Sequence, residues 1–280
     1  MKLTWKFHAL AAVVTSLVWM TCFNTLAVAA DVEVKVGGTG SAVGVMRLLG
    51  TAFEKANPGI KIKVMPSLGS SAGIKALAAG AIHVGIASRP LKDSELKAGV
   101  QGWEFARTPL VFATHSRVNK KSITARELEE YYTRPDAAWP DKSRIRLILR
   151  PEQDTDSLMI AGISPGMPQA LKAAHGRSGM ILAITDQEAS ENIIKTSGSL
   201  GAASLAEIVS EKLPLNILSF NGITPSIKTL ADRSYPLVKP LIVAISPTTS
   251  PEGMRFVEFV RSPAAIKILQ ANGCLPSKTR

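Results

Sequence analysis

The chain has 280 residues, of which 46% are hydrophobic and 20% charged, a globular composition that excludes whole-chain disorder, collagen and coiled coil. Its formal net charge of +11 favours an anionic partner or ligand. Aromatic residues make up only 5% and do not interleave with basic ones, so nucleic acid is not the predicted partner. Two cysteines cannot form a disulfide framework and no histidines lie at metal-ligand spacing, so we predict no cofactor or metal.

Residues 1–30 have the features of a secretory signal peptide. Lys2 and Lys6 precede an apolar stretch at 9–20, and small residues precede Asp31. The apolar stretch is shorter than the roughly 20 residues that a membrane span requires. We therefore predict cleavage near residue 30 and release of a monomeric protein into the periplasm.

After this segment, the hydrophobic pattern alternates between strands and helices. Apolar alternation or short apolar runs predict strands at 32–36, 60–64, 82–87, 108–114, 145–149, 215–220 and 237–245. Helical spacing and capping residues predict helices at 45–53, 74–79, 124–132, 186–195 and 251–261, and a last one ending near 272. Pro165 and Pro168 predict a break, and Pro240 indicates an edge or crossover position. The order of elements predicts an α/β fold with a largely parallel sheet.

Three loops rich in small, hydroxyl or charged residues follow predicted strands, at 37–41, 69–73 and 150–157. The first two open helices, whose free N–H groups and partial positive charge bind anions. Arg89 and Arg150 also follow strands, at the edge where open α/β sheets bind ligands. The pattern favours an anion site, although such loops also serve simply as turns and caps.

A serine hydrolase is one alternative. The segment GSSAG around Ser71 matches the nucleophile motif G-x-S-x-G, and Asp154 or Asp156 followed by His175 would complete a triad in hydrolase order. The same pattern recurs at 162–166 in a proline-broken stretch, so a match carries little weight in a chain with 21 glycines. We therefore predict that the protein is not an enzyme.

Taken in chain order, the loops resemble the periplasmic phosphate-binding proteins of ABC transporters and their wider substrate-binding family. The matching segments are GGTGS at 37–41, LGSSAGIKAL at 68–77, IASRPL at 86–91, NGITPS at 221–226 and GCLP at 273–276. Their order and spacing span essentially the whole chain after the signal segment.

The resemblance implies an α/β, two-lobed periplasmic binding protein of the type II-like class, hinged by crossover strands. Lobe 1 would comprise residues 31–113 plus 222–280 and lobe 2 residues 114–221, with crossovers near 111–114 and 219–222. Such a protein captures a small phosphate-like oxyanion between its lobes and delivers it to an ABC permease. A different small charged solute, or a role as a sensor subunit, remains an alternative.

The resemblance also implies a set of ligand-binding residues at the ends of the strands. They are Thr39, Gly40, Ser41, Ser70, Ser71, Ser88, Arg89, Arg150, Asp154, Thr155, Asp156 and Ser157.

Two features depart from the pattern of the phosphate-binding proteins. Arg89 stands where those proteins place an aspartate that accepts the proton of hydrogen phosphate, and Asp154-Thr155-Asp156 replaces a Ser-Gly-Thr loop. Carboxylates repel an anion unless they are paired, so these acids either turn onto Arg89 or Arg150 or serve a ligand other than plain phosphate. A ligand with both cationic and anionic groups would suit them.

Overall fold

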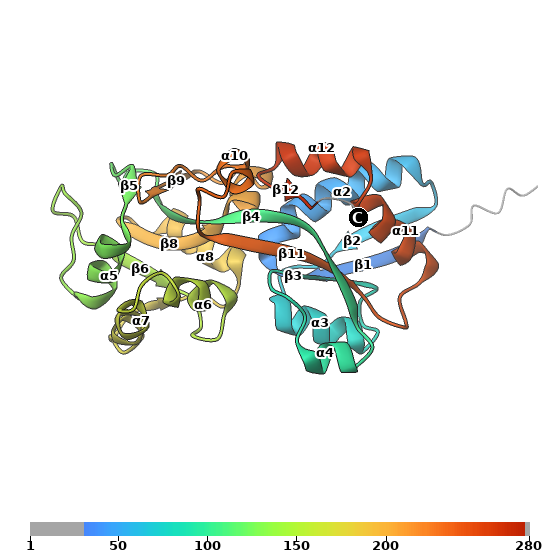
Figure 1. Ribbon diagram of the computed structural model, residues 1–280, viewed down its shortest axis with the longest axis horizontal. Helices are drawn as coiled ribbons and strands as arrows, with labels where there is room; N and C mark the ends of the chain where they lie inside the picture. The colour runs from blue at the N-terminus through green and yellow to red at the C-terminus, as the bar shows by residue number, and fades with distance from the viewer. Residues whose placement is uncertain (1–30, 278–280) are drawn as a thin grey trace, which may run out of the picture. The chain divides into compact units, whose positions relative to one another are not determined.

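The structure, a computed structural model, describes residues 31–277 (Figure 1). Residues 1–30 lie outside this part, so the signal peptide stays a prediction. Within 31–277, no helix is both long enough and apolar enough to cross a membrane.

Strands and helices alternate along most of the chain. The strands are β1 (Val32–Gly38), β2 (Ile60–Val64), β3 (Val84–Ala87), β4 (Gln101–His115), β5 (Ser122–Ile123), β6 (Arg146–Leu149), β7 (Ile181–Leu182), β8 (Ser199–Ser204), β9 (Leu215–Ile217), β10 (Ser219–Phe220), β11 (Val238–Ile245) and β12 (Leu275–Pro276). The helices are η1 (Gly40–Ala42), α2 (Val43–Ala56), α3 (Ser70–Ala78), α4 (Asp93–Lys97), α5 (Ala125–Thr133), α6 (Thr155–Ala161), α7 (Met167–His175), α8 (Asp186–Lys195), α9 (Leu205–Ser210), α10 (Ile227–Ala231), α11 (Pro251–Val260) and α12 (Pro263–Ala271).

One mixed sheet connects most of these strands, in the order β2-β1-β3-β11-β4-β8-β6-β7 with β9 and β12 beside β4. The strands pair in parallel at both ends of this order and antiparallel in its middle. Figure 1 shows β4 and β11 running together through the middle, with α2, α3, α11 and α12 on one side and α5 to α8 on the other. The predicted α/β class is confirmed, but the prediction of a largely parallel sheet is wrong, because the long strands β4 and β11 run antiparallel to each other and to their neighbours β8 and β3.

Buried hydrophobic residues form four clusters, and the two largest lie toward opposite ends of the sheet as separate cores. In one, the ring of Phe53 packs edge-on against Phe256 at 5.4 Å and Phe259 at 5.5 Å between ring centroids. In the other, Phe112 packs against Phe220 at 5.6 Å, also measured between ring centroids. Two separate cores are what a two-lobed protein requires, because each lobe must bury its own apolar surface.

The lobe boundaries stay a prediction. Leu230, Tyr235 and Leu237, which the sequence assigns to lobe 1, pack into the same core as Leu147, which lies in predicted lobe 2. Their packing favours a second crossover near Val238, at the start of β11, rather than at 219–222.

Local signals predict several elements correctly and miss others. The predicted capping box of α5 is present, because Thr124 Oγ1 accepts from Glu127 N–H at 3.1 Å and Glu127 accepts from Thr124 N–H at 2.9 Å. The break predicted at Pro168 is wrong: this proline lies in the first turn of α7, where its missing N–H costs no helical hydrogen bond. Small buried residues hide β8, which has neither polar alternation nor a run of branched side chains.

At Pro240, β11 is paired with a neighbouring strand on one side only, so the missing N–H of proline can face the unpaired side. Along β11, Pro240 pairs with Arg107 of β4, whereas β3 pairs only with residues 242–244. The register of β11 against β4 also shifts just after Leu241. Pro240 therefore sits at a local edge inside a central strand, as proline in a sheet requires.

Candidate anion-binding site

The end of β1 positions the first loop of the site. Gly38 has a φ of 145°, and a Cβ there would lie 1.8 Å from the carbonyl oxygen of Ile86. Only glycine therefore lets β1 end so close to β3. Thr39 N–H donates to the same carbonyl at 2.9 Å, and the chain turns directly into η1.

Three predicted hydroxyl residues from three strand ends form one cluster. Thr39 Oγ1 donates to Ser88 Oγ at 3.2 Å, and Ser88 Oγ lies 3.1 Å from Ser70 Oγ. Ser88 N–H also donates to Ser70 Oγ at 3.0 Å. All three side chains are buried. The structure thus brings the loops after β1, β2 and β3 together as the sequence predicts.

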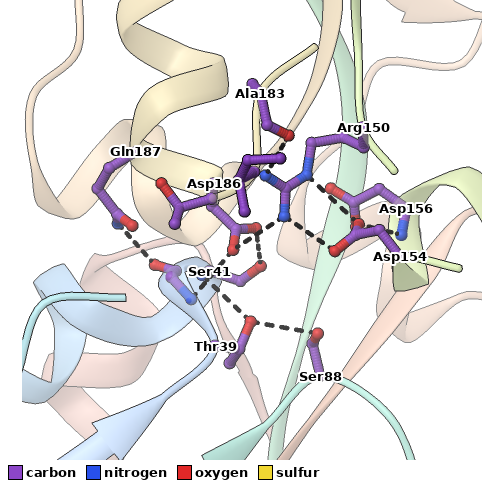
Figure 2. Close-up of polar contacts among 12 residues, drawn as sticks. Thr39, Ser41, Ser88, Arg150, Asp154, Asp156, Ala183, Asp186 and Gln187 are labelled. Atoms are coloured by element: carbon purple, nitrogen blue, oxygen red, sulfur yellow. Dashed lines mark hydrogen bonds and ion pairs between the residues drawn. The ribbon is translucent and has the colours of Figure 1, made fainter. Parts of the chain in front are cut away.

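Beside this cluster, the first loop binds a carboxylate from α8. Asp186 Oδ2 accepts from Gly40 N–H at 3.0 Å, and Asp186 Oδ1 accepts from Ser41 Oγ at 2.9 Å. Asp186 Oδ2 also lies 3.9 Å from Arg150 Nη2, so a cation faces the same carboxylate. Figure 2 shows this carboxylate between Ser41 and Arg150. We call the Gly40 N–H, the Ser41 hydroxyl and the Arg150 guanidinium the anion cradle.

Arg150 is held rigidly at the end of β6. Its side chain is 4% exposed, and its guanidinium donates to Asp154 at 2.9 Å and to the Ala183 carbonyl at 3.0 Å. Asp154 also caps α6 by accepting from Asp156 N–H at 3.0 Å. Burial alone would lower the pKa of Arg150, but the carboxylates of Asp186 and Asp154 outweigh it and raise that pKa. Arg150 therefore stays charged.

A second buried cation lies on β11. Lys239 Nζ bonds Asp156 Oδ1 and lies 3.6 Å from Asp186 Oδ1. Lys239 is 1% exposed and Asp156 2%, so both are sealed from water. Burial opposes the charge on Lys239, yet Asp156 and Asp186 raise its pKa. Burial likewise opposes ionisation of Asp186, but Lys239 and Arg150 lower its pKa.

Glu207 is a third buried acid in this region, and it forms no ion pair with any of the residues that the structure describes. Its Oε1 accepts from Ser190 Oγ at 2.9 Å, while its Oε2 has no hydrogen-bond partner among the described residues. Burial and the neighbouring Asp186 carboxylate raise the pKa of Glu207 well above its ordinary value. Within residues 31–277, no group of three or more His, Cys, Asp or Glu side chains is arranged to hold a metal ion.

Arg89 and Ser71, although predicted for the site, contact each other and not the cradle. Arg89 donates to both oxygens of Glu95, at 2.7 and 2.9 Å, and to Ser71 Oγ at 3.1 Å. No hydrogen bond among the described residues joins Ser71 to His175, which lies at the end of α7. The geometry that a hydrolase triad needs is not formed.

Of the remaining predicted residues, Ser157 supports Arg150 directly. Ser157 Oγ donates to the carbonyl oxygen of Arg150 at 3.1 Å, which ties the start of α6 to the end of β6. Thr155 is the first residue of α6 and is half-buried. The predicted turning of the acids onto basic residues holds for Asp154, which pairs with Arg150, whereas Asp156 pairs with Lys239.

Asp186, Lys239 and Gln187 are the residues that sequence reasoning missed. Gln187 Nε2 donates to the Gly40 carbonyl at 3.0 Å, beside the bond from Gly40 N–H to Asp186. An acid in the first turn of a helix looks like an ordinary helix-terminus residue, which hides Asp186. A lysine inside an apolar strand was a usable signal for Lys239, because lysine is rarely buried without a partner.

Comparisons with known proteins agree with this architecture. Residues 24–264 match the family model described as a PBP superfamily domain. The phosphate-binding protein PstS of Borreliella burgdorferi is 26% identical over 258 residues, which cover 88% of this chain and 90% of that protein.

Solved structures show the same fold. A protein from Clostridium perfringens described as a phosphate ABC transporter substrate-binding protein, with bound phosphate, superposes with a TM-score of 0.75 at 20% identity and covers 88% of this chain and 100% of its own. The periplasmic molybdate-binding protein of Azotobacter vinelandii superposes with a TM-score of 0.60 at 13% identity, covering 89% of this chain and 100% of its own. The family match and the two-core α/β fold lead to one conclusion: this chain belongs to the PBP superfamily.

Proposed function

We propose that this protein captures a small phosphate-type oxyanion outside the cytoplasm and delivers it to an ABC permease, without catalysing a reaction. The observation that carries the proposal is that the anion cradle already binds an anionic group, the carboxylate of Asp186, in a buried position. Backbone N–H, hydroxyl and guanidinium donors of this kind bind oxyanions in general. The relatives named for phosphate binding support phosphate as the first ligand to test.

The hydroxyl cluster extends the cradle in this proposal. Thr39, Ser70 and Ser88 are all buried, and within residues 31–277 their side chains exchange hydrogen bonds only among themselves and with nearby backbone. Hydroxyls rotate freely, so they can turn from one another to an oxyanion and either donate to it or accept from it. We assign these three residues to the ligand-facing wall.

Isothermal titration calorimetry with inorganic phosphate tests the proposal. The wild type is expected to bind phosphate, and Arg150→Ala to lose roughly tenfold or more in affinity, because it removes the buried cation of the cradle. Arg134→Ala is the matched control, since Arg134 is an exposed arginine paired with Glu130 and Asp136. Unchanged affinity in Arg150→Ala would remove Arg150 from the site. Binding of sulfate, molybdate or a zwitterionic amino acid in place of phosphate would support a different small charged solute.

We extend the proposal to the location and partner of the protein. The predicted signal segment and the family support export, with cleavage near residue 30. In this proposal the exported protein is a monomer that works with a permease. Mass spectrometry of the osmotic-shock fraction is expected to find a chain beginning near residue 31. An uncleaved chain that stays in the cytosolic fraction would contradict this part.

A further inference from the structure

We propose that Asp186 is an internal ligand of the anion cradle, and that an external oxyanion binds by displacing its carboxylate from Gly40 and Ser41. This inference rests on the proposed function. On this inference, competition from Asp186 lowers the affinity for the oxyanion, although no sequence pattern marks Asp186 as a site residue.

The contacts of Asp186 are those of a bound anion. Its two oxygens accept from a backbone N–H at the start of a helical segment and from a buried hydroxyl, and each oxygen faces a cation, Arg150 or Lys239. Only 6% of the residue is exposed. The lowered pKa of Asp186, for which Lys239 and Arg150 outweigh the effect of burial, agrees with a carboxylate that stays charged here.

The cradle cannot hold Asp186 and an oxyanion at the same time. A Cβ built on Gly40 would lie 2.3 Å from Gln187 Oε1 and 2.7 Å from both Asp186 Cβ and Asp186 Oδ2, so the start of α8 packs directly against the loop. No room remains between them for a further group. Two anions in one buried site would also repel each other strongly. The oxyanion must therefore take the place of the carboxylate.

Asp186 is the carboxylate that the two cations can release. Arg150 contacts Asp154 at 2.9 Å but Asp186 only at 3.9 Å. Lys239 bonds Asp156 and keeps Asp186 at 3.6 Å. Each cation thus has a closer partner of its own, and three carboxylates share two cations. When Asp186 leaves, both buried cations remain paired.

A tetrahedral oxyanion can make contacts that the carboxylate cannot. Both oxygens of Asp186 are already bound to Gly40 N–H and Ser41 Oγ, and the distance of 3.9 Å to Arg150 is too long for a hydrogen bond. Phosphate brings two further oxygens, which can reach Arg150 and the hydroxyls of Thr39 and Ser88. Against this gain, Asp186 has the advantage of being tethered in place, so it competes at a high effective concentration. The wild type should therefore bind phosphate more weakly than a protein with an empty cradle.

The experiment is a calorimetric titration of inorganic phosphate into the wild type, Asp186→Asn, Asp186→Ser and Glu188→Gln. Both Asp186 variants should bind phosphate at least tenfold more tightly than the wild type, because an uncharged side chain competes poorly for the cradle. Glu188→Gln is the matched control: it removes one negative charge from the same helix, at an exposed residue that accepts from Ile184 N–H and does not contact the cradle. It should bind like the wild type. Circular dichroism and thermal denaturation identify any variant that fails to fold, and the serine variant then replaces the asparagine variant.

Every other result of this titration overturns either the internal-ligand inference or the proposed function. Equal affinities in the wild type and the Asp186 variants would overturn the internal ligand while leaving the proposed function in place. Weaker binding in the Asp186 variants would also overturn it, and would make Asp186 an acceptor for the proton of hydrogen phosphate. An equal gain in Glu188→Gln would show a general charge effect and overturn the inference. Absence of phosphate binding in all four proteins would overturn both the proposed function and the internal ligand.

Discussion

Arg150 and Arg89 both come just after the end of a strand, but they face different carboxylates. Each follows the end of a strand at the edge of the sheet where a ligand is expected, Arg150 after β6 and Arg89 after β3. Arg150 is buried and faces both Asp154 and Asp186. Arg89, with 16% of its side chain exposed, turns to Glu95 on α4. A basic residue after a strand thus indicates the correct edge of the sheet, but its partners decide which way it faces.

The carboxylate that pairs with Arg89 is close to it in sequence, whereas the carboxylate that the anion cradle binds is far away along the chain. Glu95 lies six residues after Arg89 and also accepts from Lys92 N–H at 2.8 Å. The hydrogen bond from Arg89 lowers the pKa of Glu95 despite partial burial of this carboxyl. Asp186 reaches Gly40 across 146 residues of chain. Local pairing therefore holds Arg89 away from the cradle, whereas tertiary packing delivers a carboxylate to Arg150.

The largest expected effect is on the free energy of unfolding, and it distinguishes Arg150 from Arg89. Arg150→Ala should lower the free energy of unfolding by about 3–5 kcal/mol, because it leaves the buried carboxylate of Asp186 and the half-buried carboxylate of Asp154 without their arginine. Arg89→Ala should cost about 1 kcal/mol, because Glu95 lies on α4, a helix with no buried residue, and keeps the hydrogen bond from Lys92 N–H. Urea denaturation at neutral pH measures both. Similar losses would show that the two arginines do not differ in their surroundings.

The next largest effect on the free energy of unfolding is expected at Glu207, the buried acid that forms no ion pair within residues 31–277. Glu207→Gln should raise the free energy of unfolding by about 2 kcal/mol at neutral pH, because it removes a buried group that resists ionisation and keeps the acceptor for Ser190. The pKa of Glu207 is raised in the folded protein, so the folded state holds a proton that the unfolded state releases above about 4.5. Its cost to stability therefore grows as the pH rises above 4.5, and it disappears below.

Denaturation of the wild type and Glu207→Gln across pH 4 to 8 measures this dependence. The stability difference between them should shrink as the pH falls toward the ordinary glutamate range. Glu191→Gln, at an exposed acid of α8, serves as control and should stay within about 0.5 kcal/mol of the wild type at every pH. A difference that does not change with pH would mean that Glu207 is not a titrating group in this range.

The sequence is informative about the fold wherever the signal is local. The capping box of α5, the acidic start and regular spacing of α8 and the alternation of β2 each lie within a few residues, and the structure contains all three elements where they were predicted. Strand β8 was missed because its six residues are small and buried throughout, so they show no period. Strand β4 begins at Gln101, earlier than the predicted 108, because its first part alternates weakly between exposed and half-buried residues.

For the site, the sequence indicates the hydrogen-bond donors but not Asp186, the carboxylate that accepts from them in the folded protein. The loops after β1, β2 and β3 meet because parallel strands end at one edge, so Thr39, Ser70 and Ser88 were predictable together. Asp186 and Lys239 come from an ordinary helix start and from the beginning of a strand, and only the folded chain brings them to the same place. Their proximity to Asp156 depends on packing between distant elements, which no local pattern encodes.

A smaller effect is expected on binding at Asp154. Asp154→Ser should bind inorganic phosphate roughly tenfold more tightly than the wild type, since it releases Arg150 from its closest carboxylate and removes a like charge. Serine is also a good helix cap, so α6 keeps the acceptor that Asp154 provides for Asp156 N–H. The companion change Asp156→Thr is not expected to help, because it leaves Lys239 buried and unpaired. Calorimetry compares the two single variants, and weaker binding in Asp154→Ser would indicate that Asp154 holds Arg150 in the geometry that the ligand needs.

The smallest effect is expected at Ser71, the residue that contacts Arg89. Its substitution also tests whether the protein is a binding protein or a hydrolase. Ser71 Oγ accepts one hydrogen bond from Arg89 and is exposed, so Ser71→Ala removes about 1 kcal/mol of interaction at most and leaves the bidentate pair between Arg89 and Glu95 intact. Phosphate affinity and unfolding free energy should therefore stay close to those of the wild type in calorimetry and urea denaturation. His175→Ala, at the other residue of the hypothetical triad, should likewise leave phosphate affinity unchanged. A chromogenic ester assay completes the test: turnover by the wild type that both substitutions abolish would make Ser71 a nucleophile and overturn the binding function, since a triad must then form in solution that these contacts do not contain.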